Sequence, residues 1–182
     1  MVEELKAIVR SGTLGDLCHI HCEMPQETYL RVDPEGRPIK PQDWRLKDDN
    51  RVPTVSLDLG IHIFNLIDYI TEERPLQVTS TTSNHGNFKG IADSINCIGK
   101  YTNNLDINIW YGKTALGHRN GLKIRIYGKK GSLEWEQSFP EIIRYSNSHG
   151  YISILERGAE GLLKANSSTY NRFKAGHPAG FI

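Results

Sequence analysis

One stretch of the chain, from Thr54 to Ile70, constrains the fold more than any other, because a few polar side chains interrupt an otherwise apolar run. Asp58, His62, Asn65 and Tyr69 follow one another at spacings of four, three and four residues. An α-helix turns about 100° per residue, so these spacings place all four side chains on one helix face. The sequence therefore predicts a helix that carries a narrow polar stripe.

Both flanks of this stripe are apolar, with Leu59, Ile63, Leu66 and Ile70 on one side and Leu57, Ile61 and Phe64 on the other. A surface helix normally presents charged residues over a broad face, so this pattern predicts a buried helix that exposes only the stripe, as a pocket wall does. Buried ionisable groups are costly unless they are paired or used. An alternative stays open, in which Asp58 favours the helix start and His62 is a satisfied core histidine.

Length and charge exclude several classes of protein. A chain of 182 residues with 38% hydrophobic content supplies the core of one domain, and a second domain of normal size would not fit. The net charge of +1, with both signs evenly mixed, predicts neither a nucleic-acid partner nor a membrane partner. The apolar runs are too short to span a bilayer, and the start, MVEELKAIVRSG, lacks the pattern of a signal peptide. We expect a cytoplasmic protein.

The cysteines predict neither disulfides nor a metal site. Cys18, Cys22 and Cys97 are too few for a disulfide framework, and we expect reduced thiols. Cys18 and Cys22 flank two histidines, but a strand would place these two thiols about 13 Å apart. That separation is too large for one metal ion, and the two histidines without a nearby third ligand make a weak site.

The order of elements predicts an α+β fold. A helix over 2–10 precedes a strand around 18–22, and a long loop over 25–53 has Trp44 as its one large apolar group. Alternating or β-rich patterns after the striped helix predict strands over 76–82, 94–102, 105–111, 122–127, 132–137, 141–145 and 151–155. Asn120-Gly121 and the segment 128–131 are hairpin signals. We expect a broad, mainly antiparallel open sheet with helices on one face, and a homo-oligomer that covers the other face.

No glycine pattern predicts a nucleotide site in this chain. A dinucleotide fingerprint needs G-x-G-x-x-G at a strand-to-helix turn, and a P-loop ends in GKS or GKT after an earlier glycine at a fixed distance. The chain contains no G-x-G, and Gly112-Lys113-Thr114 lacks that earlier glycine. We therefore expect that the chain by itself binds neither NAD nor NADP.

The segment LDLGIHIFNLIDYI resembles the D-x-G-x-H segment in the carboxy-terminal domain of the Gfo/Idh/MocA family of NAD(P)-dependent sugar and polyol oxidoreductases. Other segments resemble the family in the same order, namely LKAIVRSGTLGDL, PQDWRL, ALGHRNGLKIRIYGKKGSLEWEQ and RFKAGHPAGFI. The resemblance covers essentially all 182 residues. It implies that residues 1–182 are a single substrate-binding and oligomerisation domain, and that the amino-terminal Rossmann domain, which binds the dinucleotide and supplies a lysine for proton transfer, is absent from this chain.

The resemblance also implies site residues. Asp58 and His62 match the family's aspartate and histidine and are the expected catalytic pair. Asn65 stands at a position that is commonly acidic, which leaves hydrogen bonding to a sugar hydroxyl as its expected role. Trp44 and Arg45 match a loop that borders the active site, with a loop anchor and a surface ion pair as the alternative. His177 is a further substrate-binding candidate, with a helix-entry role as the alternative.

These residue types suit the oxidation of an alcohol. Hydride leaves the carbon for the nicotinamide of NAD or NADP, and the hydroxyl loses a proton that an imidazole can accept near neutral pH. Asp58 is expected to orient His62 or to bind a neighbouring hydroxyl. Two hypotheses follow: the substrate-binding and catalytic half of an NAD(P)-dependent oxidoreductase acting on a sugar or polyol, or a non-catalytic carbohydrate-binding or assembly module with the same fold.

Overall fold

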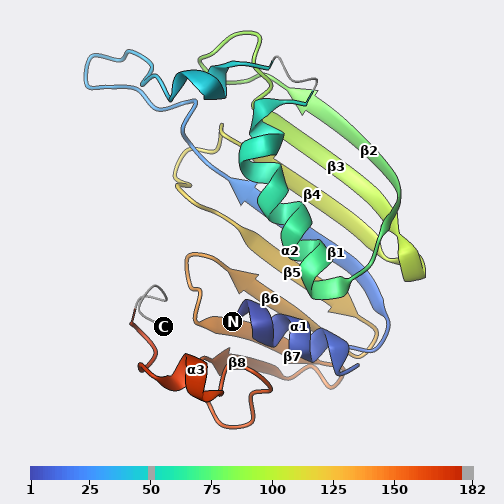
Figure 1. The fold of residues 1–182 in the computed structure, drawn as a ribbon. Coiled ribbons are helices and arrows are strands. Elements are labelled where there is room, and N and C mark those ends of the chain that lie inside the picture. Colours follow the sequence, from blue (N-terminus) through green and yellow to red (C-terminus); the bar gives the residue numbers. More distant parts are fainter. Residues whose placement is uncertain (49–51, 178–182) are drawn as a thin grey trace.

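A computed structural model describes residues 1–48 and 52–177 (Figure 1). Its helices are α1 (Val2–Arg10), α2 (Ile61–Thr71) and the short α3 (Ser168–Asn171). Its strands are β1 (Leu17–Pro25), β2 (Pro75–Ser83), β3 (Ser94–Tyr101), β4 (Asp106–Gly112), β5 (Lys123–Gly128), β6 (Gly131–Glu136), β7 (Ile142–Asn147) and β8 (Ile152–Glu156). Each strand predicted after the striped helix lies within two residues of its expected bounds.

The described strands form one eight-stranded sheet in the order β2-β3-β4-β1-β5-β6-β7-β8. β1 pairs in parallel with β4, and every other neighbouring pair is antiparallel. The segment 128–131 makes the predicted hairpin, since Tyr127 pairs with Ser132. The hairpin expected at Asn120-Gly121 is wrong, because β1 lies between β4 and β5 and the chain must pass over it.

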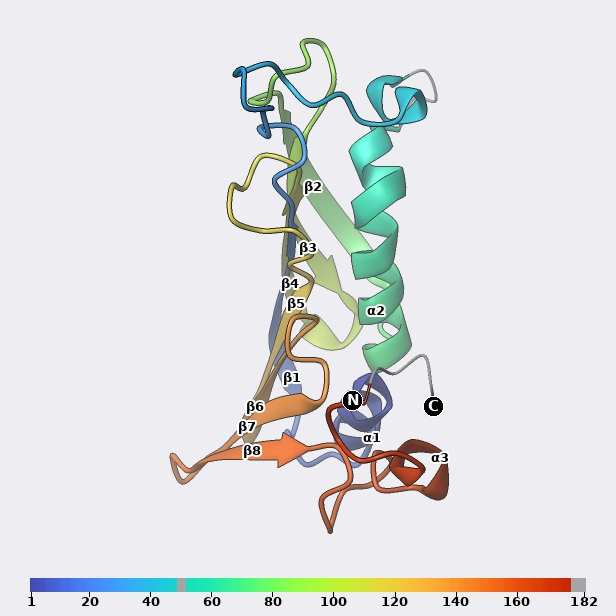
Figure 2. The same ribbon diagram turned by 90° about the vertical axis from the view of Figure 1, so that its left-hand side faces the viewer.

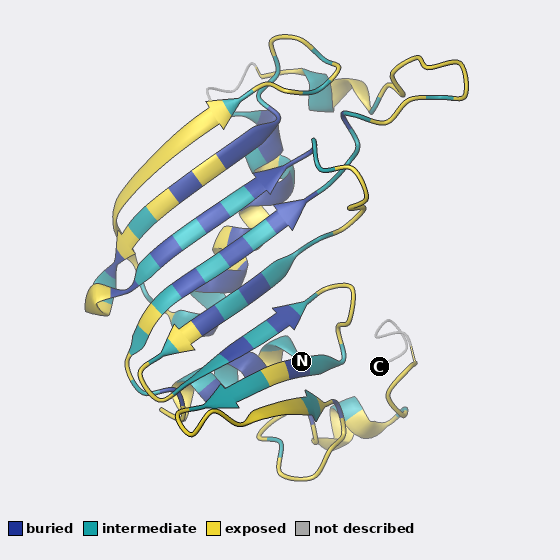
Figure 3. Cartoon of the chain, turned by 180° about the vertical axis from the view of Figure 1, so that it is seen from behind, coloured by how far each residue is buried: buried dark blue, intermediate teal, exposed yellow. Residues whose placement is uncertain are grey.

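All helices lie on one face of the sheet, which confirms the predicted α+β architecture (Figure 2). The core lies between α1, α2 and this face, where inward residues of alternate strand positions, such as Ile20, Ile107 and Ile126, are buried. None of the helices within residues 1–48 and 52–177 covers the opposite face, and along the central strands buried positions alternate with partly exposed ones (Figure 3). Trp110 points to this open face, whereas Trp135 is buried on the helix side.

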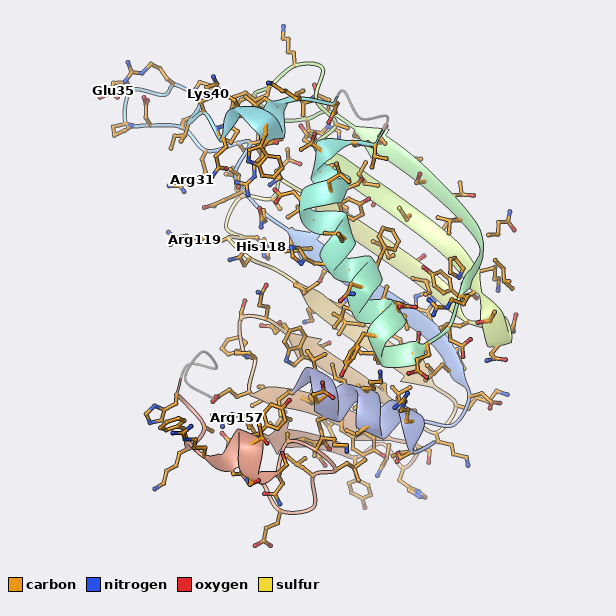
Figure 4. All side chains as sticks on the ribbon, in the orientation of Figure 1. Arg31, Glu35, Lys40, His118, Arg119 and Arg157 are labelled. Atoms are coloured by element: carbon orange, nitrogen blue, oxygen red, sulfur yellow. The ribbon has the colours of Figure 1, made fainter. Side chains whose placement is uncertain are left out.

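The loop after β1 projects beyond the sheet and carries Arg31, Glu35 and Lys40 at its exposed end (Figure 4). Its buried anchor is Tyr29, not Trp44, which is 50% exposed. Tyr29 Oη donates a hydrogen bond of 2.7 Å to the carbonyl oxygen of Arg45, which returns the loop to the body of the domain. Residues 49–51 of this predicted loop lie outside the described residues.

At the opposite end of the domain, two buried charged residues hold the segment that follows β8. The Glu4 carboxylate accepts hydrogen bonds from the backbone N–H groups of Leu163, Lys164 and Ala165, at 2.8, 2.6 and 2.9 Å. Arg157, labelled in Figure 4, pairs with Glu141 at 2.6 Å and donates to the backbone carbonyls of residues 173 and 174. We call this arrangement the carboxy-terminal clasp.

Within residues 1–48 and 52–177, no helix combines the length and the apolar character that crossing a membrane requires.

Candidate functional site

The helical run that contains α2 begins at Thr54, and its first part is a π-turn over Ser56–Gly60. A π-turn closes i to i+5 hydrogen bonds, so each residue turns through a smaller angle than in an α-helix. The stripe was predicted on the assumption that every residue turns through the same angle, and this assumption does not hold at Asp58. Single π-turns of this kind occur frequently at functional sites.

Tyr111, at the end of β4, packs beneath the π-turn. Its hydroxyl lies 2.9 Å from Ser56 Oγ, and its ring approaches Gly60 so closely that a Cβ there would lie 3.0 Å from Cζ. A side chain at position 60 would therefore push the π-turn away from the sheet. This contact fixes the height of Asp58 above the end of β4.

The Asp58 carboxylate turns towards the sheet and contacts two cations. Lys113 Nζ makes an ion pair and hydrogen bond with Asp58 Oδ2, and Arg45 Nη2 donates to Oδ1 at 3.3 Å. Arg45 Nε lies 3.0 Å from Oδ2, but its N–H is not directed at that oxygen, so this contact is an ion pair without a hydrogen bond. Within the described residues no hydrogen bond or ion pair joins Asp58 to His62, and the expected role of Asp58 in orienting His62 stays a prediction.

Burial shifts the pKa of Lys113 within this cluster and that of Tyr29 beside it. The Lys113 side chain is 1% exposed, and desolvation lowers its pKa, although hydrogen bonding and attraction to Asp58 oppose that shift. Burial also raises the pKa of Tyr29 to about 12, with the Asp58 charge as the second cause. The ring of Tyr29 lies beside the cluster, with Lys113 Nζ 5.5 Å from its centroid. Two cations and one carboxylate give the cluster an excess positive charge.

The middle of the stripe, His62 and Asn65, lies on the outer side of α2. His62 and Asn65 are exposed, and so are Leu57, Ile61 and Phe64. The predicted burial of both apolar flanks is therefore wrong for this second flank, while Leu59, Ile63, Leu66 and Ile70 are buried as expected. A helix that rests on one sheet face buries only one side, so these exposed apolar side chains form an outer surface beside His62.

Arg45 joins Trp44 to the Asp58 cluster. The described residues 43–46 form a 3-10 turn, and the Arg45 guanidinium lies 4.9 Å from the centroid of the Trp44 ring. The same guanidinium pairs with Asp58, so the loop and the π-turn meet at this point. The structure thus brings Asp58 and Arg45 together, with Trp44 against Arg45.

Two residues considered from sequence lie elsewhere. Tyr69 donates a hydrogen bond to Glu3 and stacks against Lys6, so it belongs to the contact between α2 and α1. His177 is exposed, with its ring centroid 5.2 Å from that of Phe173 in the clasp region. The segment after α3 lies at the far end of the sheet from the start of α2 (Figures 1 and 2). The structure does not bring His177 to Asp58, and residues 178–182 of its motif lie outside the described residues.

Sequence reasoning missed Lys113 and Tyr29. The alternation of β4 contained the signal for Lys113, since Ile107, Ile109 and Tyr111 point inward and position 113 continues that period of two. Reading Gly112-Lys113-Thr114 only as a turn discarded this signal. No comparable pattern marks Tyr29, because it lies in a loop without periodicity.

Comparison with known proteins gives a consistent result. Residues 2–134 match the family model described as "GFO/IDH/MocA C-terminal domain". The chain is 25% identical over 149 residues to the uncharacterized oxidoreductase YfiI of Bacillus subtilis, covering 80% of this chain and 37% of that protein. An inositol dehydrogenase homolog from Azotobacter vinelandii, complexed with NADH and myo-inositol, is 22% identical with a TM-score of 0.80, over 97% of this chain and 44% of that one.

A further crystal structure of an inositol dehydrogenase homolog from Azotobacter vinelandii, complexed with NAD+, has a TM-score of 0.82 at 23% identity, over 97% of this chain and 46% of that one. An oxidoreductase from Sinorhizobium meliloti has a TM-score of 0.77 at 22% identity, over 97% and 45% of the two chains. This chain thus spans less than half the length of each of these proteins. This chain therefore has the fold of the carboxy-terminal domain of such oxidoreductases. The chain belongs to the GFO/IDH/MocA family, whose C-terminal domain it matches over residues 2–134.

Proposed function

We propose that this chain is the substrate-binding and catalytic half of an NAD(P)-dependent oxidoreductase that acts on a hydroxyl of a sugar or polyol. The observation that carries the proposal is the Asp58 cluster, a carboxylate held by two cations at a π-turn, with exposed His62 four residues further along the same helical run. Perturbed, partly buried ionic groups next to an exposed imidazole are typical of catalytic sites.

Each residue has a distinct part in this proposal. His62 accepts the proton of the reacting hydroxyl, since its ring is exposed and an imidazole exchanges protons near neutral pH. Asp58 binds a hydroxyl of the substrate, and the excess positive charge of its cluster favours the developing alkoxide. Trp44, Arg45 and Asn65 border the substrate, and a role there for His177 requires movement of the segment after α3.

The cofactor of this proposal is held by another domain. NAD or NADP supplies the hydride acceptor, but this chain contains no G-x-G that could cradle its pyrophosphate. Leu57, Ile61 and Phe64 form an exposed apolar surface beside His62, and a dinucleotide domain seated there would bring the nicotinamide to the substrate. The lengths of the relatives, more than twice that of this chain, are consistent with such a domain.

Two measurements test this proposal. This chain together with a dinucleotide-binding domain, whether in one polypeptide or as a separately encoded partner, should oxidise a polyol such as myo-inositol with NAD or NADP. The chain of residues 1–182 alone should show no activity and no binding when titrated with NADH and NADPH by calorimetry. Micromolar binding to the isolated chain contradicts the assignment of the cofactor. Absence of dehydrogenase activity from the intact protein against a panel of polyols favours the non-catalytic binding or assembly module.

We also propose that copies of the protein associate through the open sheet face. Trp110 is half-buried there, and Ile98, Ile152 and Ile154 are exposed on the same face. Exposed apolar groups on one surface favour an interface. Light scattering of the intact protein should give at least a dimer, and an Ile98→Lys/Ile154→Lys variant should reduce the mass. A monomer of the wild type at tens of micromolar argues against this interface.

A further inference from the structure

Lys113 occupies a fixed place between three parts of the chain. Its backbone N–H donates to the carbonyl oxygen of Asp93 at 2.8 Å, and its own carbonyl accepts the N–H of Tyr29 at 2.9 Å. The backbone of Lys113 is therefore hydrogen-bonded on one side to the loop before β3 and on the other side to the loop after β1. These two hydrogen bonds fix the Lys113 backbone, and so fix the point beneath the π-turn from which its side chain extends.

The Lys113 ammonium has few partners, and Asp58 is the chief one. Nζ contacts Asp58 Oδ2 and lies 3.5 Å from Gln26 Oε1, while the rest of the side chain is covered. At 1% exposure the side chain is out of reach of a substrate, which excludes direct proton exchange with a bound sugar. An ammonium this deeply buried needs a carboxylate partner, so each group determines the position of the other.

The two oxygens of Asp58 are used unequally. Oδ2 contacts both the Lys113 ammonium and Arg45 Nε, whereas Oδ1 receives only the 3.3 Å hydrogen bond from Arg45 Nη2. A carboxylate oxygen accepts two hydrogen bonds, so Oδ1 retains an acceptor position. The Asp58 side chain is 15% exposed, so it is not closed off from solvent.

We propose that Lys113 is a positioning residue, which fixes the Asp58 carboxylate so that Oδ2 is occupied and Oδ1 accepts a single substrate hydroxyl. This inference rests on the proposed function and adds to it a residue outside the reach of substrate. Arg45 cannot replace Lys113, because Arg45 is partly exposed on a loop, whereas Lys113 is anchored at the end of a central strand.

Two substitutions with side chains of similar length separate the charge of the Lys113 ammonium from its hydrogen bonding to Asp58. Lys113→Met removes both the charge and the donor, and Lys113→Gln removes the charge but keeps a donor for Asp58. Crystal structures of the chain should show the Asp58 carboxylate displaced in Lys113→Met and retained in Lys113→Gln. An Asp58 side chain that stays in place in Lys113→Met overturns the positioning role.

Kinetics of the intact protein supply the second readout. Lys113→Met should lower kcat about 10²-fold, the size expected when a reacting group is misplaced by about 1 Å, while the KM for the dinucleotide changes less than twofold. Lys113→Gln should recover at least a tenth of the wild-type kcat. Equal kcat in the wild type and Lys113→Met overturns the inference and leaves the proposed function standing.

A double variant distinguishes action through Asp58 from general destabilisation. If Lys113 acts only through Asp58, Lys113→Met/Asp58→Asn should be no slower than Asp58→Asn alone, whereas independent effects would multiply. This double variant also removes both buried charges, so it should fold even where Lys113→Met does not. If the intact wild type has no dehydrogenase activity, the proposed function fails, and the Asp58 position in the crystal structures still decides the role of Lys113.

Discussion

Asp58 and Glu4 are both carboxylates withdrawn from solvent, at opposite ends of the domain, but their oxygens are used in different ways. Glu4 is buried and accepts three short backbone N–H hydrogen bonds across both oxygens. Asp58 is matched by two side-chain cations, retains partial exposure and keeps an acceptor position on Oδ1. The difference indicates that burial alone does not identify a functional carboxylate. We propose that the free acceptor position, with an exposed imidazole four residues further along the same helical run, marks Asp58 as the functional one of the two.

The largest expected effect concerns the site end of the molecule. In the intact protein, His62→Ala should lower turnover by a factor on the order of 10² to 10⁴, because a positioned proton acceptor contributes that much to the rate. His149→Ala, which removes an exposed imidazole from the loop between β7 and β8, is the matched control and should leave turnover unchanged. Steady-state kinetics and a melting temperature for each variant test this. Unchanged turnover in His62→Ala would indicate that the Asp58 cluster only stabilises the fold, as Glu4 does at the other end of the domain.

The next effect concerns the clasp end. Glu4→Gln should lower the free energy of unfolding by about 2 to 3 kcal/mol, because an amide cannot accept from all three backbone N–H groups and leaves buried donors unpaired. Urea denaturation measures the loss. Glu160→Gln changes an exposed carboxylate on the same segment and should cost less than 0.5 kcal/mol. Equal stabilities of the two variants would contradict the anchoring role of Glu4.

A smaller effect is a pH dependence of the free energy of unfolding, which reports the burial of Tyr29 beside the Asp58 cluster. The pKa of Tyr29 is about 12 in the folded protein and about 10 in an unfolded chain, so the folded state holds this proton more tightly. The resulting stability is fully present below pH 10 and is lost as the pH rises from 10 towards 12. The stability advantage of the wild type over Tyr29→Phe should therefore narrow by about 1 to 2 kcal/mol between pH 8 and pH 11.5. Guanidinium denaturation at both pH values tests this, with Tyr151→Phe as the control that removes an exposed phenol.

The smallest effect tests whether the polar stripe is one functional unit. Tyr69 contacts Glu3 and Lys6 on α1, at a distance along the helix from the Asp58 cluster. Tyr69→Phe should change turnover less than twofold and stability by less than about 0.5 kcal/mol, because its lost hydrogen bond is at the surface. A loss of turnover approaching that of His62→Ala would extend the site along the whole stripe.

The fold could be predicted from sequence because its signals are local. Period-two alternation in segments such as 105–111 and 122–127 placed the strands, and the amphipathic pattern of 2–10 placed the first helix. The position of β1 could not be predicted in this way. Its pairing with β4 joins residues far apart in the sequence, and no local pattern records which strands become neighbours.

The site could be predicted only in part, for a related reason. Asp58 and His62 were found from their spacing, but the spacing assumed a uniform α-helix, and the π-turn directs Asp58 to the sheet while His62 faces outward. The partners of Asp58 come from a loop and from the end of β4, which only the tertiary structure brings together. The alternation of inward and outward residues along β4 was the one available clue to Lys113.

The central place of β1 has a consequence for how the domain folds. The strands β2, β3 and β4 form one antiparallel meander, and β5 to β8 form another, each from neighbours in sequence. Among the described strands, β1 is the one that joins the two meanders, through pairings that close loops of more than 80 residues. Such closure is slow compared with hairpin formation, so the insertion of β1 should limit the folding rate, and the two meanders should remain separate until it occurs.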